Sequence, residues 1–244
     1  MNLSPIILLC FLSANACTSK ENLKRPIKQG LVVMKTVFYD SSGTVKFVDT
    51  LKIWYKDSVA IQEIHRINLS NNSSKTPPQV TYSVILYRYM DLKNKALYDY
   101  KTFSDSAVMQ NKASLPDSGM RDYGWSFYSE VLRRIQGTPE PLSDTILGNV
   151  TYRRTRFHFT HDDPKKSFIV GYFRCDGVNE MFSLEKSYSH KIGCVMTKFS
   201  EFGVDQINPF ATIEVEFISD SLNDRELGVF QAWGTNAKQN PIIK

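Results

Sequence analysis

The chain has 244 residues, a mass of 28.0 kDa and a formal net charge of +5; 42% of its residues are hydrophobic and 23% are charged. This composition supplies enough apolar surface for a sizeable core, so it excludes a mainly disordered chain and predicts one globular domain, or at most two small ones. The basic residues are scattered along the whole chain, which gives no electrostatic case for a nucleic-acid binder.

The first 17 residues carry no charged side chain and contain a short apolar run, Ile6–Leu12. This run is far shorter than the roughly 20 residues that span a bilayer, whereas a short apolar stretch before small residues is typical of an export signal. An A-x-A site at residues 14–16 would release a chain beginning at Cys17. We therefore expect an export signal at 1–17, a polar tether at 18–30 and a single β-rich domain at 31–244; the alternative for the first segment is a buried strand.

Residues 13–17 also resemble a bacterial lipobox, in which the cysteine is acylated and becomes the first mature residue. The sequence leaves open whether Cys17 is acylated or is simply the mature N-terminus. An acyl anchor would hold the domain at a membrane surface rather than across it. The expected location is then the periplasm or the outer membrane, with the membrane as partner through the anchor.

Alternation of apolar and polar residues with a period of two dominates the rest of the chain and predicts strands. The expected strands lie at 31–39, 45–55, 59–68, 79–90, 95–103, 149–159, 167–175, 180–188, 193–199 and 210–219. Short turn signals join several of them, so we predict a mainly β fold: a large curved antiparallel sheet or open half-barrel, with one or two short helices.

Two segments have helical periodicity instead. Residues 125–135 place their apolar side chains on one stripe and are followed by helix-breaking Gly137 and Pro139. Near the C-terminus, Ser221 could cap a short helix that buries Leu222, Val229, Phe230 and Trp233.

The strand at 79–90 is apolar or aromatic on both faces: simple alternation puts Tyr82 and Leu86 on one face and Tyr87 and Tyr89 on the other. Either helices cover the second face, or that face lines a cavity for an apolar ligand. We name six residues as candidate ligand contacts: Trp54, Tyr82, Leu86, Tyr87, Tyr89 and Tyr172.

The four cysteines predict one disulfide. Cys10 leaves with the signal and Cys17 would be acylated, which leaves Cys175 and Cys194, 19 positions apart and each beside a strand-like run. In an oxidising compartment an even remainder is most simply one disulfide between neighbouring strands, and two buried free thiols are the alternative.

Five Asp-Ser/Thr dipeptides continue with an aliphatic residue. This triplet resembles the O-glycosylation motif of exported proteins of the Bacteroidota, and the candidate acceptors are Thr50, Ser58, Ser106, Thr145 and Ser221. The alternative is local, because Asp and Ser both favour turns that precede strands.

No catalytic motif for hydrolysis, nucleotide binding or metal-dependent chemistry occurs, and we assign no catalytic residue, metal or cofactor. His158 and His161 form the tightest polar cluster, but residues three apart on a strand face opposite sides, which argues against a shared metal.

The lipobox-like start, the turn Asp91-Leu92-Lys93 and the run from Leu147-Gly148 to Gly171-Tyr172 resemble two groups of bacterial envelope proteins. One has the LolA-like lipid-carrier fold, an open half-barrel closed by helices; the other comprises the GLPGLI-type envelope proteins. The GLPGLI string itself is absent, so no functional residue is carried over. The resemblance implies an envelope protein with an apolar concavity.

Three functions remain open. The leading hypothesis is a non-catalytic, exported protein that binds a lipid-like or apolar ligand in its curved sheet. The second is a structural or partner-binding envelope lipoprotein with a fully packed sheet. The third is an enzyme acting on glycans or the cell wall. Two close carboxylates in a cleft, or an acidic residue beside His158, would support this hypothesis.

Overall fold

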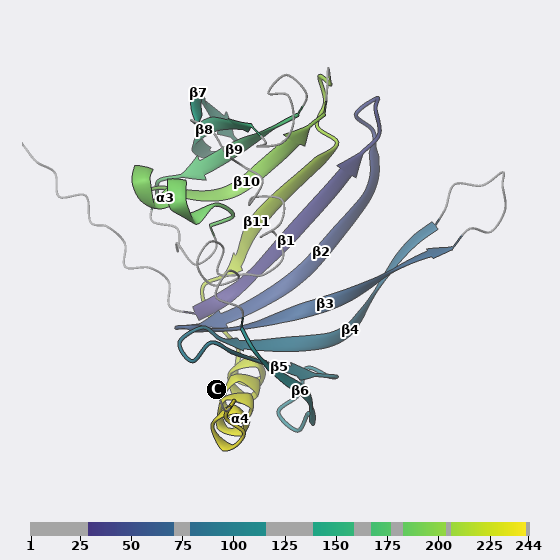
Figure 1. Cartoon of the computed structure of the whole chain (residues 1–244), viewed down its shortest axis with the longest axis vertical. Helices are drawn as coiled ribbons and strands as arrows, with labels where there is room; N and C mark the ends of the chain where they lie inside the picture. Colours follow the sequence, from purple (N-terminus) through teal and green to yellow (C-terminus); the bar gives the residue numbers. More distant parts are fainter. Residues whose placement is uncertain are drawn as a thin grey trace, which may run out of the picture.

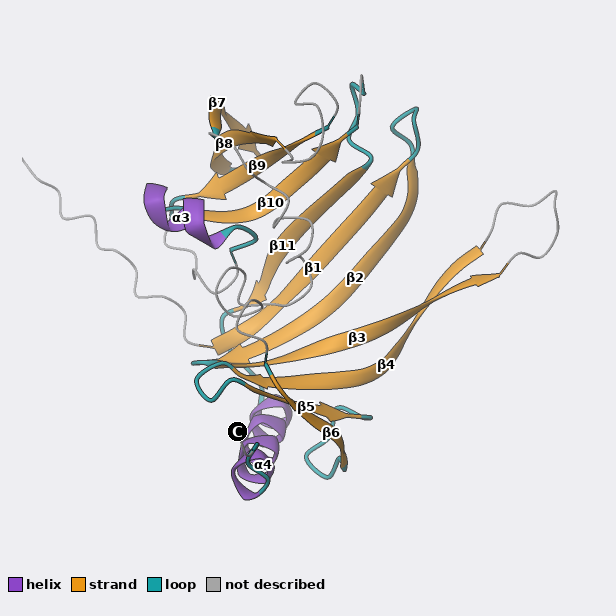
Figure 2. Cartoon of the chain, in the orientation of Figure 1, coloured by secondary structure: helices purple, strands orange, loops and turns teal. Residues whose placement is uncertain are grey.

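A computed structural model describes residues 29–70, 79–115, 139–158, 167–176, 183–203 and 206–242 (Figure 1). The strands are β1 (Gln29–Tyr39), β2 (Val45–Lys56), β3 (Val59–Ser70), β4 (Gln79–Asp91), β5 (Ala96–Tyr100), β6 (Met109–Ser114), β7 (Glu140–Leu147), β8 (Val150–His158), β9 (Phe168–Arg174), β10 (Val195–Phe202) and β11 (Ala211–Ser219). The helices are α3 (Lys186–Ile192) and α4 (Asp224–Gln239). Strands dominate the described part of the chain, as predicted (Figure 2).

All the strands join one antiparallel sheet in the order β6-β5-β4-β3-β2-β1-β11-β10-β9-β8-β7. The first strand lies in the middle: β2 to β6 run outward from it on one side, and β11 to β7 lie in reverse order on the other. No pairing between β6 and β7 is recorded for the described residues, so the sheet is curved but open. The prediction of a large, curved, open antiparallel sheet is confirmed.

The sheet buries side chains on both faces. On one face a core cluster runs from β2 across β1, β11, β10, β9 and β8, and α3 packs against it through Tyr188 and Ile192. The opposite face carries α4, whose Val229, Phe230 and Trp233 pack on aromatic residues of β2, β4 and β5. Figure 1 shows the two helices at different ends of the molecule. Helices therefore do cover parts of the doubly apolar sheet.

Strands β2 and β3 pair only at one end. Their register covers Ile53–Lys56 against Val59–Gln62, whereas β3 pairs with β4 over its whole length. Beyond Ile53 the two strands diverge, and the β3–β4 hairpin leaves the sheet (Figure 1). We call this divergence the fork.

A bulge in β4 changes which face its residues occupy. The β3–β4 register shifts between Ile64 and His65, so that Leu86 lies opposite Ile64 while Val84 lies opposite His65. Because directly paired residues point to the same face, Tyr82 shares the face of Tyr87 and Leu86 lies on the other one. The sequence-based expectation that Tyr82 and Leu86 share a face is wrong, since strict alternation does not anticipate the extra residue.

Four other element predictions need correction. Residues 186–192, expected in part as a strand, form α3, because the Glu185 carboxylate accepts hydrogen bonds from the backbone N–H groups of Tyr188 and Ser189 and caps the helix. Strand β5 ends at Tyr100 rather than at 103, and β6 and β7 were not expected at all. Strand β1 begins at Gln29, inside the predicted tether. The helix expected at 125–135 lies outside the described residues.

Helix α4 confirms the C-terminal helix with a different cap. Asn223, not Ser221, is the N-cap: its side chain accepts from the Glu226 backbone N–H at 3.0 Å, and the Glu226 carboxylate accepts from the Asn223 N–H at 2.9 Å. This reciprocal capping box fixes the start of the helix. All four predicted apolar residues of this segment are buried.

The predicted disulfide is present. Cys175 follows β9 and Cys194 precedes β10, and their sulfur atoms are bonded. The bond closes a loop that contains α3, so it holds this helix against the sheet.

Candidate functional site

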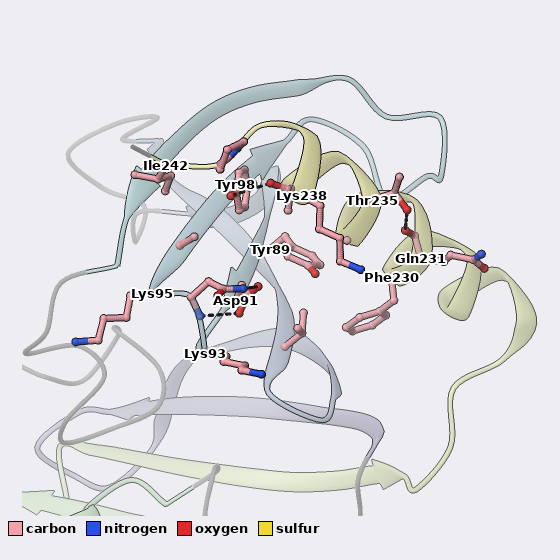
Figure 3. A pocket seen from close by; sticks show the side chains of 16 residues that line it. Tyr89, Asp91, Lys93, Lys95, Tyr98, Phe230, Gln231, Thr235, Lys238 and Ile242 are labelled. Atoms are coloured by element: carbon pink, nitrogen blue, oxygen red, sulfur yellow. Dashed lines mark hydrogen bonds between the residues drawn. The ribbon is translucent and has the colours of Figure 1, made fainter. Parts of the chain in front are cut away.

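A pocket of about 910 Å³ lies between α4 and the strands β3 to β5 (Figure 3). Its walls include the buried rings of Tyr89, Tyr98 and Phe230, and Val59 and Ile242 complete the apolar surface. The volume of this pocket lies within the range of small-molecule sites.

Helix α4 is held on the sheet by aromatic contacts beside the pocket. The Trp233 indole stacks on the Tyr100 ring with centroids 3.9 Å apart and donates from Nε1 to the Ser104 carbonyl at 2.9 Å. At the other end, the Trp54 indole donates to the Glu226 carboxylate at 2.7 Å, so a capping residue of α4 also binds strand β2. These contacts hold α4, which forms one wall of the pocket, against the sheet. Glu226 takes part in both the capping box and the contact with Trp54, so the start of the helix is held in the same way.

Polar groups surround the apolar surface. The tight β4–β5 turn brings Asp91, Lys93 and Lys95 to one side, and α4 places Lys238 on the other. The Asp91 carboxylate already accepts from the backbone N–H and the side-chain amide of Asn94, at 3.0 and 2.7 Å. The pocket therefore combines an apolar interior with a rim on which positive charge exceeds negative charge.

The Tyr89 hydroxyl is the central polar group of the pocket. Burial raises the pKa of the Tyr89 phenol, so the hydroxyl stays protonated at neutral pH. No hydrogen bond within the described part of the chain uses this hydroxyl, and a Cβ atom placed on Gly234 would lie 3.3 Å from it. Tyr89 can therefore donate to or accept from a bound molecule.

A second pocket of about 570 Å³ adjoins the first. Both are lined by Val59, Tyr89, Phe230 and Gln231, and the second extends toward the β2–β3 turn at Asp57. Together they form a groove along α4, which we call the α4 groove.

The six predicted ligand contacts do not meet in one cavity. Tyr89 lines the pocket, and Trp54 and Tyr87 pack nearby around Phe103, with ring centroids 4.3 and 5.4 Å from it. Tyr82 lies at the fork near Phe47, with centroids 6.1 Å apart. Leu86 lies half-buried on the opposite face of the sheet, because of the bulge.

Tyr172 lies in the other half of the sheet, where its ring packs edge-on against Tyr152. The sequence prediction missed the α4 residues of the pocket, Gln231, Gly234, Thr235 and Lys238. Their position on the polar side of an amphipathic helix gives no local signal that they face a cavity.

A partly buried ion-pair cluster lies at the fork. His65 Nδ1 lies 3.1 Å from the Asp49 carboxylate and its Nε2 lies 3.4 Å from that of Glu63. The Glu63 carboxylate also accepts from the Lys52 backbone N–H at 2.9 Å, at the first position beyond the β2–β3 ladder. The side chain thus replaces the backbone partner that the diverging strand no longer supplies.

These carboxylates raise the pKa of His65 from 6.5 to about 9: the hydrogen bond to Asp49 contributes most and the Glu63 carboxylate beside Nε2 next, against the lowering by burial. The imidazole is therefore charged at neutral pH and bridges two acids. A protonated histidine in this role stabilises structure and is no general base.

A second buried polar group lies on the face that carries α3. Gln62 is 1% exposed, and neither its amide nitrogen nor its amide oxygen has a hydrogen-bond partner among the residues that the structure describes. Its cross-strand neighbour Arg88 is instead paired with the buried Asp99 at 2.8 Å. No described pocket opens at Gln62, so we assign it no ligand.

His158 has an acidic neighbour: its Nε2 lies 3.8 Å from the Glu140 carboxylate, which also pairs with Arg156 at 3.2 Å. Glu140 is 52% exposed at the sheet edge, so the pair is a surface contact rather than a cleft. His161 lies outside the described residues. Among the residues that the structure describes, no group of histidine, cysteine or acidic side chains could hold a metal ion.

The five candidate glycosylation acceptors are all at least partly accessible. Thr50, Ser58, Ser106 and Ser221 are exposed, and Thr145 is half-buried in the edge strand β7. Thr50 lies in the middle of β2, where the turn explanation for the motif does not apply. Cys17 and the predicted export signal lie outside the described residues, and no described helix is long and apolar enough to cross a membrane.

No family model matches the chain, and no curated protein matches it. Among solved structures, the chain is similar to PNGF-II with a TM-score of 0.33 and 10% sequence identity, over 82% of this chain and 30% of that one. The chain thus spans less than a third of that structure, and a likeness at this level carries no functional argument. The fold and pocket define a mainly β protein with an open sheet and a helix-covered groove.

Proposed function

We propose that the protein is an exported, non-catalytic binding protein for a lipid-like or apolar ligand, and that the ligand occupies the α4 groove. The observation that carries the proposal is the pocket of about 910 Å³ with the rings of Tyr89, Tyr98 and Phe230 in its walls. Apolar walls supply affinity through the removal of ligand surface from water, while a few polar groups orient the ligand.

Export and membrane anchoring form part of the same proposal. They are supported by the charge-free first 17 residues and by the small-residue site before Cys17. The Cys175–Cys194 bond also agrees with an oxidising compartment, where disulfides persist. An acyl chain on Cys17 would keep the α4 groove close to a membrane, where apolar ligands are found.

The test is native mass spectrometry on the chain from residue 18 onward, produced in an exporting host without detergent. We expect an added mass that organic solvent releases. The variant Gly234→Leu fills the pocket from within α4 and should lose the added mass, because a Cβ at this position already approaches Tyr89. The matched control Gly228→Leu lies on the same helix with open space around it and should retain the added mass.

An unmodified mass in the wild-type protein would refute ligand carriage. Retention of the added mass in Gly234→Leu would place the ligand outside the α4 groove. Circular dichroism is measured on each variant: a native spectrum together with a lost mass indicates that the pocket is filled, whereas a changed spectrum indicates unfolding.

A second candidate, partner binding, is favoured by the edge strand β7. Ile146 and Leu147 are 69% and 39% exposed there, and edge strands present unpaired backbone groups to other chains. Analytical ultracentrifugation of the wild type and of Ile146→Lys tests it: self-association that Ile146→Lys abolishes would support an interface at β7.

A further inference from the structure

The charged groups around the α4 groove are unevenly balanced. Among the residues that the structure describes, four charged ones line the larger pocket: Lys93, Lys95, Lys238 and Asp91. Asp91 is the only acid among them, and the Asn94 backbone and amide already hydrogen-bond to its carboxylate. The lysines thus dominate the charge that a bound molecule meets.

Two of the lysines are directed into the pocket. Figure 3 shows Lys238 on α4 and Lys93 on the β4–β5 turn extending into the opening from opposite walls, whereas Lys95 points away. No ion pair or hydrogen bond among the described residues occupies the ammonium group of Lys93 or Lys238. The protonated hydroxyl of Tyr89 is a third donor, and it is also unused.

We propose that the ligand of the α4 groove is a single-chain amphiphile with an anionic oxygen head group, a carboxylate or a phosphate, which the lysines of the pocket rim, Lys93 and Lys238, attract. This proposal rests on the proposed function and adds the chemistry of the head group. The chain of the ligand would lie against Tyr89, Phe230 and Val59 along the groove, where the second pocket continues the apolar surface.

The arrangement selects against other head groups. A cationic head group would meet two ammonium groups of like charge, and a neutral hydroxyl would form only ordinary hydrogen bonds. Hydrogen bonds between charged partners are about twice as strong as neutral ones, and they strengthen next to a low-dielectric surface such as the rings of Tyr89 and Phe230.

The test compares four probes with the same dodecyl chain: dodecanoate, dodecyl phosphate, dodecanol and dodecyltrimethylammonium. Binding to the protein from residue 18 onward is measured by isothermal titration calorimetry below the micellar concentration of each probe. We expect the better of the two anions to bind about tenfold or more tightly than dodecanol at low ionic strength, with the cation weakest. The comparison of carboxylate with phosphate identifies the head group.

The double variant Lys93→Gln/Lys238→Gln should bind the anionic probes no more tightly than dodecanol. The control Lys46→Gln/Lys101→Gln removes the same net charge at exposed positions outside the pocket and should keep the preference. Raising the salt concentration should reduce the preference in the wild type.

Equal binding of all four probes would overturn the anionic head group while leaving ligand binding intact. A preference that survives the double variant would also overturn it, because the selectivity would then arise elsewhere. If no probe binds, the proposed function itself fails.

Discussion

His65 at the fork provides the sharpest test of the electrostatics of this fold. The variant His65→Gln keeps a polar side chain of similar size but removes the charge between Asp49 and Glu63, which lie 3.1 and 3.4 Å from the imidazole. We expect it to destabilise the protein at neutral pH and to change how the free energy of unfolding depends on pH.

The magnitude follows from the His65 pKa of about 9, against 6.5 for an unperturbed imidazole. Because the pKa is raised on folding, the stabilisation is fully present below pH 6.5 and is lost as the pH rises through about 9. The difference corresponds to about 3 kcal/mol at most. Asp49 remains 22% exposed, so solvent screening reduces the expected effect to about 2 kcal/mol.

The assay is urea unfolding of wild type, His65→Gln and the control His190→Gln between pH 6 and pH 9.5. His190 is exposed on α3, and no ion pair in the described part of the chain holds it. The wild type should lose about 2 kcal/mol more than His65→Gln across this range, so that the two stability curves converge above pH 9. Parallel curves would refute the ion-pair cluster as the cause.

Four further predictions concern stability, each measured by urea or thermal unfolding. Gly228→Ala on α4 has open space for its Cβ and should stabilise by about 0.5–1 kcal/mol through helix propensity; no gain would contradict the open space around this position. Gly171→Ala places a Cβ 2.5 Å from Met196 and should destabilise by about 1–3 kcal/mol, whereas an unchanged midpoint would show that the core yields. Gln62→Leu removes a buried amide that has no partner in the described part of the chain and should stabilise by about 1–3 kcal/mol; destabilisation would mean that the amide has a partner in solution. Reduction of Cys175–Cys194 should cost about 3 kcal/mol, and an equal stability of both redox forms would contradict a structural role.

The strands were largely predictable because their information is local. The period-two alternation from 210 to 219 gave β11, with Ala211, Ile213 and Val215 buried as expected. The C-terminal helix was predictable for the same reason, since the spacing of Val229, Phe230 and Trp233 is a helical stripe. The disulfide followed from cysteine arithmetic: the predicted export signal and the predicted acylation of Cys17 left two cysteines beside strand-like runs.

Other features depended on contacts that the local pattern does not contain. The strand expected at 180–188 is partly α3 because the Glu185 side chain caps it, and the facing of β4 changes because one extra residue bulges. The edge strand β7 was missed, because Ile146 and Leu147 are adjacent apolar residues, both exposed, and give no period-two alternation.

The sequence by itself determined that this is a mainly β chain with a covering C-terminal helix, because burial periodicity is a property of neighbouring residues. The tertiary structure decided where a ligand could bind. The α4 groove joins Tyr89 on β4 to Lys93 in the next turn and to Lys238 on a helix far along the chain. The fork likewise joins Asp49 to His65 only because β2 and β3 diverge there. Such sites arise from the packing of distant segments, and no local spacing encodes which segments meet.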